Sequence, residues 1–165
     1  MRRITIVTVL AVLLIPMLRA SVAFGQEAPL VPGVSTLKGI SGVQVLIEDL
    51  SDSAKALGLE KETIQTDVEL KLRLAGIHIL SEEEDNNTPG APSLYVNVRV
   101  VRSAAAVAVE LKQGVRLVRN GELSQGTTWS VGGVGANLTA ESIRNHIKDY
   151  LDEFLNAWLS VNPRK

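Results

Sequence analysis

The sequence contains no cysteine and few aromatic residues. The absence of cysteine from all 165 residues excludes disulfide bonds, a thiol nucleophile and the lipid-bearing cysteine of a bacterial lipoprotein. A domain built from this chain must therefore be held together by its apolar core. Aromatic side chains make up 4% of the composition, so we expect aliphatic residues to fill most of that core. Most of the aromatic content is carried by Tyr95, Trp129, Tyr150, Phe154 and Trp158.

Common catalytic signatures are also missing. The chain has no His-Glu-x-x-His motif, no Gly-x-Ser-x-Gly elbow and no Gly-x-x-x-x-Gly-Lys-Ser/Thr phosphate loop. His78 and His146 are the only histidines, and they fall in separate predicted elements, which argues against a shared metal site. A hydrolase using Ser130 or His146 is the weakest of three functional hypotheses, because no base and orienting group can be placed beside either residue. We predict no catalytic residue, no bound metal and no cofactor.

Residues 1–25 have the three-part pattern of a secretory signal peptide. Two arginines precede an apolar run over residues 4–18, and small residues follow up to Gly25. A run of about 15 residues spans about 22 Å as a helix, less than the roughly 30 Å hydrocarbon core of a bilayer. We therefore expect cleavage after Gly25, or alternatively after Ala23. The product would be exported to the periplasm or beyond, without a stable membrane anchor.

The chain that remains is mildly acidic. Without the three arginines of the first 25 residues, 14 of the 17 basic residues remain against 18 acidic ones, a net charge of −4. This balance gives no electrostatic reason to expect nucleic acid or an anionic membrane as a partner. Residues 26–40 contain two prolines and two glycines without a sustained period, which predicts a flexible leader. A single domain is predicted over residues 41–165.

Alternating apolar residues predict the strands of one sheet. Val43 to Glu48 and Ile77 to Leu80 flank a helical segment, so they would be parallel strands in a right-handed strand–helix–strand unit. The later part of the chain predicts an antiparallel sheet. Its strands are expected over residues 94–100, 107–117 and 127–131.

Two segments have the helical period. From Glu60 to Ala75 the apolar stripe is widened by Leu70 and Leu74, and Gly76 is placed to end the helix. A second helix begins after Thr139, which can cap it, and ends before Pro163. Its broad apolar face could bind a membrane or a partner helix, but beside an amphipathic sheet we interpret it as core.

The pairing of the later strands is only partly determined by the pattern. Matching apolar with apolar side chains sets Arg99 opposite Glu110 and Asn97 opposite Lys112 on the exposed face. A two-residue turn at Asn120-Gly121 would point Trp129 toward the polar side. A longer loop or a bulge is therefore needed to bring Trp129 inward, and the sequence leaves that register open.

Two motifs allow both a functional and a structural interpretation. The acidic run Glu82–Asp85 could bind a divalent cation, but it lacks the alternating oxygen ligands and central glycine of a calcium loop. We predict a solvated loop over residues 81–93. Gly132-Gly133-Val134-Gly135 could cradle an anion ahead of the last helix, but the dinucleotide fingerprint is incomplete. We predict a flexible joint there.

Five stretches are used for comparison with known families: Val43–Glu48, Glu69–Ile77, Leu94–Val98, Thr128–Ser130 and Phe154–Pro163. In these stretches the sequence resembles a group of small secreted bacterial α/β proteins of unassigned function. The element order is also similar to small domains of bacterial envelope proteins, namely the amino-terminal domain of the Tol translocation protein TolB, the curli secretion protein CsgG and the lipoprotein activators of penicillin-binding proteins. The chain departs from these proteins because it has no lipid-bearing cysteine and no propeller, so no functional residue carries over.

Together these patterns predict an α+β fold. We expect a two-layer sandwich of element order β-α-β-β-β-β-α, in which both helices cover one face of a mixed, mainly antiparallel sheet. The predicted role is a non-enzymatic protein-interaction or assembly module that uses the open sheet face or an edge strand. Tyr95, Asn97 and Arg99 are the candidate contact residues, and the partner would be another envelope protein.

The alternative function is a small-molecule or lipid-binding domain. Small residues over 104–108 and 132–135 could leave a cavity between the sheet and the helices. The oligomeric state is left open by the sequence.

Overall fold

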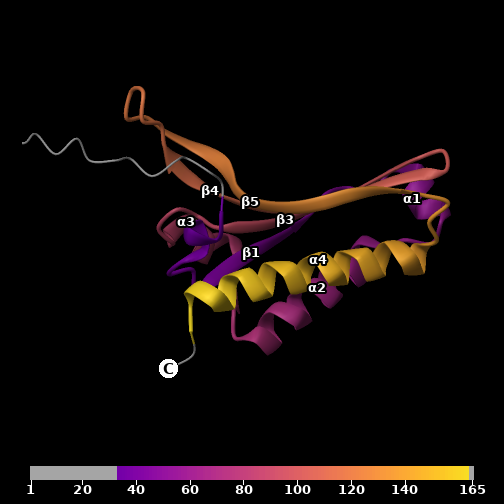
Figure 1. The fold of residues 1–165 in the computed structure, drawn as a ribbon, viewed down its shortest axis with the longest axis horizontal. Coiled ribbons are helices and arrows are strands. Elements are labelled where there is room, and N and C mark those ends of the chain that lie inside the picture. Colours follow the sequence, from indigo (N-terminus) through magenta and orange to yellow (C-terminus); the bar gives the residue numbers. More distant parts are fainter. Residues whose placement is uncertain (1–32, 164–165) are drawn as a thin grey trace, which may run out of the picture. The chain divides into compact units, whose positions relative to one another are not determined.

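A computed structural model describes residues 33–163 of the chain (Figure 1), and the predicted signal peptide lies outside them. Its elements are, in chain order, the 3-10 turn η1 (Val34–Leu37), β1 (Gly42–Ile47), α1 (Asp52–Ala56), α2 (Lys61–Ala75), β2 (His78–Ile79), α3 (Glu82–Asn87), β3 (Ser93–Val101), β4 (Ala104–Arg116), β5 (Leu123–Ala136) and α4 (Ala140–Val161). Among these residues no helix is long and apolar enough to cross a membrane.

The five strands form one mixed sheet with the order β2-β1-β3-β4-β5. β1 pairs in parallel with β2 and β3, whereas β3–β4 and β4–β5 are antiparallel. The long helices α2 and α4 contact each other and lie on one side of the sheet (Figure 1). The fold is therefore the predicted two-layer α+β sandwich.

The hydrophobic core lies between the sheet and the two long helices. β1 contributes Val43 and β3 contributes Leu94 and Val96, each fully buried. From α4, Phe154 is fully buried, and its ring meets Trp129 edge to face with 5.3 Å between ring centroids. The apolar face of α4 thus belongs to the core, as predicted. The α4 residues buried there are Ile143, Ile147, Leu151, Phe154, Leu155 and Trp158.

The ends of the long helices follow the local sequence signals. Gly76 takes the left-handed conformation at φ +90° and ends α2. At α4, Thr139 and Ser142 form a reciprocal capping box. The predicted widening of the α2 stripe was wrong, because Leu70 and Leu74 are 54% and 73% exposed. Three positions at helical spacing, Ile64, Val68 and Leu72, already fill the space between α2 and β1.

The β3–β4 pairing differs from the predicted register. Tyr95 lies opposite Glu110, and Arg99 and Asn97 lie opposite alanines rather than opposite Glu110 and Lys112. The turn is short: Val101 pairs with Ala104, and Arg102 adopts a positive φ of 55°. A shift by an even number of residues keeps every side chain on its face, so apolar alternation alone cannot select the register.

Trp129 reaches the core through a bulge. It pairs with Leu111, whereas the next residue of β4, Lys112, pairs with Thr127, so Thr128 is the extra residue. A longer connection also precedes β5, because the Leu117 amide donates to the Glu122 carbonyl. The sequence called for a longer loop or a bulge, and the structure has both; Trp129 is 9% exposed.

The glycine cluster is part of a strand rather than a flexible joint. β5 runs through to Ala136, and Gly133 and Gly135 pair with Val107 and Ala105 of β4. A Cβ on Gly133 would lie 2.6 Å from the Tyr150 hydroxyl, and one on Gly135 would lie 2.9 Å from a methyl group of Leu138. Glycine at these positions lets α4 and the segment before it approach the sheet closely.

The acidic segment after β2 was predicted as a solvated loop, and the loop conformation was wrong because the segment is helical, although none of the α3 residues is buried. Glu82–Asn87 forms α3, which begins with a capping box between Ser81 and Glu84. A Ser followed three residues later by Glu is the sequence signal for this start. The segment connects β2 with β3, and α3 contacts β1.

Packing of the domain begins ahead of Ser41. Leu37 of η1 is fully buried in the core. Asn162, at the end of α4, donates to the Leu37 carbonyl at 2.9 Å and accepts from the Gly39 amide at 2.7 Å. The Trp158 ring nitrogen donates to the Ile40 carbonyl at 2.8 Å. The last turn of α4 therefore holds residues that the sequence places in a flexible leader.

Replacing Leu37 with Ala should lower the free energy of unfolding by about 2–5 kcal/mol, because removing a fully buried leucine leaves a cavity. Val34 lies in the same turn, is 40% exposed and serves as the matched control. Val34→Ala should change stability by less than about 0.5 kcal/mol. Urea unfolding followed by tryptophan fluorescence measures both variants. Equal, small effects would mean that η1 does not belong to the cooperative core.

Candidate interaction surface

The sheet face opposite α2 and α4 carries the three predicted contact residues. Tyr95, Asn97 and Arg99 alternate with buried residues along β3 and therefore project from this open face. One end of the face is covered, because Ser93 lies on the same side of β3 and is only 2% exposed. The structure thus brings the three residues together on one surface.

A polar network links these residues to Glu48, which follows β1. The Asn97 amide donates to the Glu48 carboxylate, and the Arg99 guanidinium lies 3.6 Å from the other carboxylate oxygen. Glu48 and Asn97 are partly buried and Arg99 is exposed, and polar groups that pair with each other in this way hold their geometry in the absence of a ligand. The network therefore forms a pre-ordered polar surface. Its internal pairing also gives these polar residues a structural role that needs no ligand.

A second polar group lies beside Tyr95 on β4. The Lys112 ammonium sits over the Tyr95 ring, 3.7 Å from its centroid, and lies 3.5 Å from the Glu110 carboxylate. Partial burial raises the pKa of the Tyr95 hydroxyl above its usual value, and a hydrogen bond and charge repulsion from Glu48 raise this pKa further. The phenol is consequently a neutral hydrogen-bonding group over the whole physiological pH range.

Across the open face, from β3 toward β5, the charged side chains are followed by small apolar residues. We call this region the alanine patch; its members are Ala104, Ala106, Ala108, Gly132, Val134 and Ala136. Val134 is 79% exposed, and the β4 alanines are partly exposed. The open face therefore has a polar half around Tyr95 and an apolar half around Val134.

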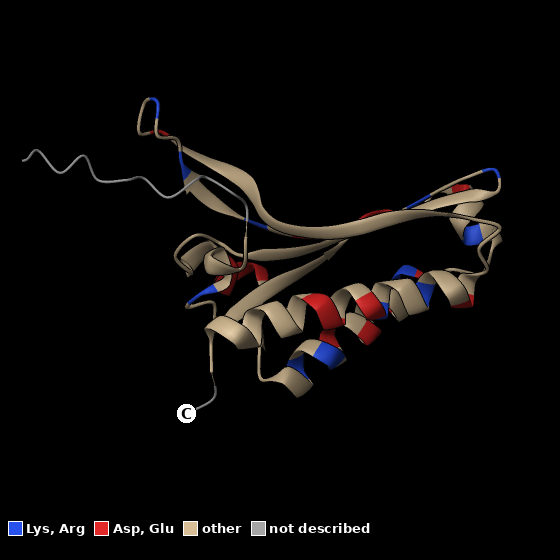
Figure 2. Cartoon of the chain, viewed as in Figure 1, with Lys and Arg blue, Asp and Glu red and all other residues tan. Residues whose placement is uncertain are grey.

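β5 forms a long open edge of the sheet. In the described part of the chain it pairs only with β4, whereas the opposite edge is β2, a strand of two residues. No charged residue and no proline occurs from Leu123 to Ala136, and Figure 2 shows β5 in tan along its length. Natural edge strands are usually protected by charge, proline, shortness or a bulge.

Part of this edge is occupied within the domain. The Thr36 hydroxyl of η1 donates to the Thr128 carbonyl at 3.1 Å, at the position of the bulge. Trp129 to Ala136 lie beyond this contact, and we call this stretch the β5 edge. It has none of the protective features.

The two histidines lie apart and neither belongs to a metal cluster. His78 Nε2 is 3.3 Å from the Glu84 carboxylate of α3, and His146 Nδ1 is 2.6 Å from the Ser142 carbonyl of α4. Within residues 33–163 no three His, Asp or Glu side chains are arranged to hold a metal ion. Ser130, the other residue of the hydrolase hypothesis, lies in β5 opposite Glu110.

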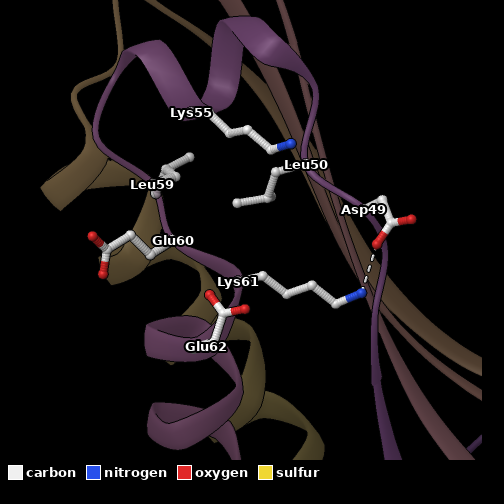
Figure 3. A pocket seen from close by; sticks show the side chains of 7 residues that line it. All are labelled: Asp49, Leu50, Lys55, Leu59, Glu60, Lys61 and Glu62. Carbon is white, nitrogen blue, oxygen red and sulfur yellow. Dashed lines mark hydrogen bonds and ion pairs between the residues drawn. The ribbon is translucent and has the colours of Figure 1, made fainter.

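A hollow lies between α1 and the start of α2 (Figure 3). It measures about 610 Å³, with Leu50 and Leu59 lining it and charged residues at its rim. The Lys61 ammonium binds the Asp49 carboxylate at 2.6 Å, and this hydrogen bond lowers the pKa of Asp49. The Asp49 side chain is 93% exposed, so the hollow is open to solvent. Because opposite charges already meet inside it, we assign it no ligand.

The space between the sheet and α4 is mostly filled. Tyr150 and Leu138 occupy the room that Gly133 and Gly135 leave, and a cavity of about 80 Å³ lies beside them. Pockets for small molecules usually measure roughly 300–1,000 Å³. Its lining includes His146 of α4 as well as Ala105 and Val107 of β4.

The comparisons with known proteins find similarity among solved structures alone. No protein-family model and no curated protein matches the chain. Among solved structures, the chain is similar to PelC from Paraburkholderia phytofirmans, solved as a dodecamer, with 15% sequence identity and a TM-score of 0.38. The match covers 72% of this chain and 87% of the PelC chain. No property of PelC is transferred to this chain at that similarity.

Replacing Glu48 with Gln should lower the pKa of Tyr95, because the substitution removes the negative charge that opposes the phenolate. The pKa should stay above its ordinary value, since the larger cause, partial burial, remains. Ultraviolet titration in a Tyr150→Phe background isolates the Tyr95 signal, because the chain has two tyrosines. Glu122→Gln, next to the exposed hairpin turn, is the control and should leave the titration unchanged. An unshifted midpoint in Glu48→Gln would contradict the proposed coupling.

Proposed function

We propose that the protein is a non-enzymatic interaction or assembly module that binds an extended segment of a partner along the β5 edge. The supporting observation is the free part of the edge, Trp129 to Ala136: beyond the bulge at Thr128 it carries no charge and no proline, and it has a neighbour on one side only. A strand placed beside it would form main-chain hydrogen bonds with the unpaired amide and carbonyl groups.

The open face supports the same proposal. A strand added at β5 would extend the alanine patch, because Val134 and Ala136 project from this face next to the edge. The partner would cover exposed apolar surface as well as main-chain groups. The polar half around Tyr95, Asn97 and Arg99 would then form the hydrophilic flank of the contact, which is where the sequence places its candidate residues.

Export supplies the expected setting. The predicted signal peptide would deliver the module to the periplasm or the outside of the cell, so its partner would be another envelope or secreted protein. Ligand binding between the sheet and the helices stays a separate prediction from the sequence.

Photo-cross-linking at the β5 edge tests the proposal in the producing cell. A photoreactive residue at Ser130 or Val134 should give protein adducts of discrete mass, because both side chains project next to the added strand. Val101 is the control: it lies on the same face and is 67% exposed, but belongs to β3. Adducts from Val101 equal to those from Ser130 and Val134, or none from either edge position, would contradict strand addition at β5.

A further inference from the structure

We infer that the protein binds a small aliphatic carboxylate in a pocket beside the turn between β3 and β4. The pocket measures about 260 Å³ and lies at one end of the sandwich, where this turn meets the end of α1 and the segment between β5 and α4 (Figure 1). Its lining contains no residue of the β5 edge, so the inference does not depend on the proposed function.

The mouth of the pocket has one charged side chain and two neutral polar ones. Arg102 is the only charged residue of the lining, and it is exposed. Ser103 and Asn137 lie beside it, where the Asn137 backbone amide donates to the Ser103 carbonyl at 2.6 Å. Within residues 33–163 none of these three side chains has an ion-pair or hydrogen-bond partner. A guanidinium with free donors binds a carboxylate through two parallel hydrogen bonds, and hydroxyl and amide donors complete the site.

The backbone at the mouth has an unusual conformation. Two of the three described non-glycine residues with a positive φ line this pocket, Arg102 and Asn137, each at 55°. Asparagine tolerates this conformation, but a turn of two residues that needs a positive φ favours glycine or asparagine over arginine. Turn formation alone therefore does not explain an arginine at position 102. Residues held in such conformations gather at binding sites, where the side chain serves the ligand.

The interior of the pocket is aliphatic. Val100 and Ala105 pair across β3 and β4, and they are 6% and 3% exposed. Leu138, ahead of α4, is partly buried, and Leu57, at the end of α1, is 42% exposed. An aliphatic chain extending inward from the guanidinium would cover this apolar surface.

Charge and size select the class of ligand. No acidic side chain of the described residues lines the pocket, so nothing opposes an anion there. The hollow between α1 and α2 differs, because Lys61 and Asp49 already pair inside it. A volume of about 260 Å³ lies just below the roughly 300–1,000 Å³ of most ligand pockets, which favours a chain of about six carbons. A phosphate would leave the aliphatic walls uncovered and would bring two charges to a single cation.

Titration of the full-length chain with hexanoate, followed by backbone amide NMR shifts, tests the inference. Hexanoate should bind with a Kd of about 1 mM or tighter, and the shifts should concentrate at residues 102–105 and 137–138. Acetate lacks the aliphatic chain and 1-hexanol lacks the charge, so each should bind at least about tenfold more weakly. No shift at these residues with about 10 mM hexanoate would overturn the inference.

The comparison of probes also decides between variants of the assignment. Equal binding of hexanoate and 1-hexanol would overturn the role of the charge, and equal binding of hexanoate and acetate would overturn the role of the walls. A short peptide that ends in leucine with a free carboxylate is the fourth probe. If it binds more tightly than hexanoate, the ligand is a chain end and the assignment to a free acid is overturned.

Replacing Arg102 with Asn separates binding from folding. Asparagine tolerates the positive φ, so the Tm of the unliganded chain should stay the same or rise. Hexanoate affinity should fall at least about tenfold, because the guanidinium is lost. Arg119→Asn, in the exposed turn between β4 and β5, is the matched control and should change neither. A destabilised Arg102→Asn chain that still binds hexanoate would mean that the arginine is structural.

A second variant tests the aliphatic wall. Leu57→Ala should reduce the preference for hexanoate over acetate at least about threefold, because it removes apolar contact. Leu74→Ala, an exposed leucine of α2, should leave the preference unchanged. An unchanged preference in Leu57→Ala would overturn the inferred orientation of the ligand. Photo-cross-linking at the β5 edge is a separate measurement, so failure of strand addition and failure of carboxylate binding are distinguished.

Discussion

The packing of α4 against the long β4–β5 pair is the constraint on which the rest of the domain depends. Phe154 meets Trp129 edge to face, and this contact requires the bulge at Thr128 to turn Trp129 inward. It also requires glycine at position 133, because the Tyr150 hydroxyl occupies the space of a side chain there. One helix face therefore determines both the bulge and the position of a glycine.

The same constraint connects the core with the surface proposed to bind a partner. Residues of β5 that accommodate α4 are small on the helix side, and residues on the open side have no layer above them. Such a strand has little side-chain bulk to obstruct a neighbour and no charge to repel one. The small residues of β5 that let α4 pack on the helix side thus leave the outer edge of the strand accessible.

The sequence predicted the fold class, the five strands, the two long helices and the core face of α4. These features follow from apolar periods of two and 3.6 residues and from caps such as Thr139 and Gly76, which are local signals. The β3–β4 register could not be predicted in the same way, because shifting Arg99 from Glu110 to Ala106 leaves all apolar residues on the same face. Leu37 also escaped prediction, since a single apolar residue in a proline- and glycine-rich segment has no period.

The candidate contact residues were placed on one surface, but the β5 edge was missed because the predicted strand ended at Val131. An uncharged run from Leu123 to Ala136 was the available signal.

Hydrogen bonds join the last turn of α4 to residues 37–40 and bring the two ends of the domain together. Trp158 and Asn162 bind the backbone of Leu37, Gly39 and Ile40, so the point where the chain enters the domain and the point where it leaves lie side by side. Attachments at either end would thus depart from a single place on the molecule.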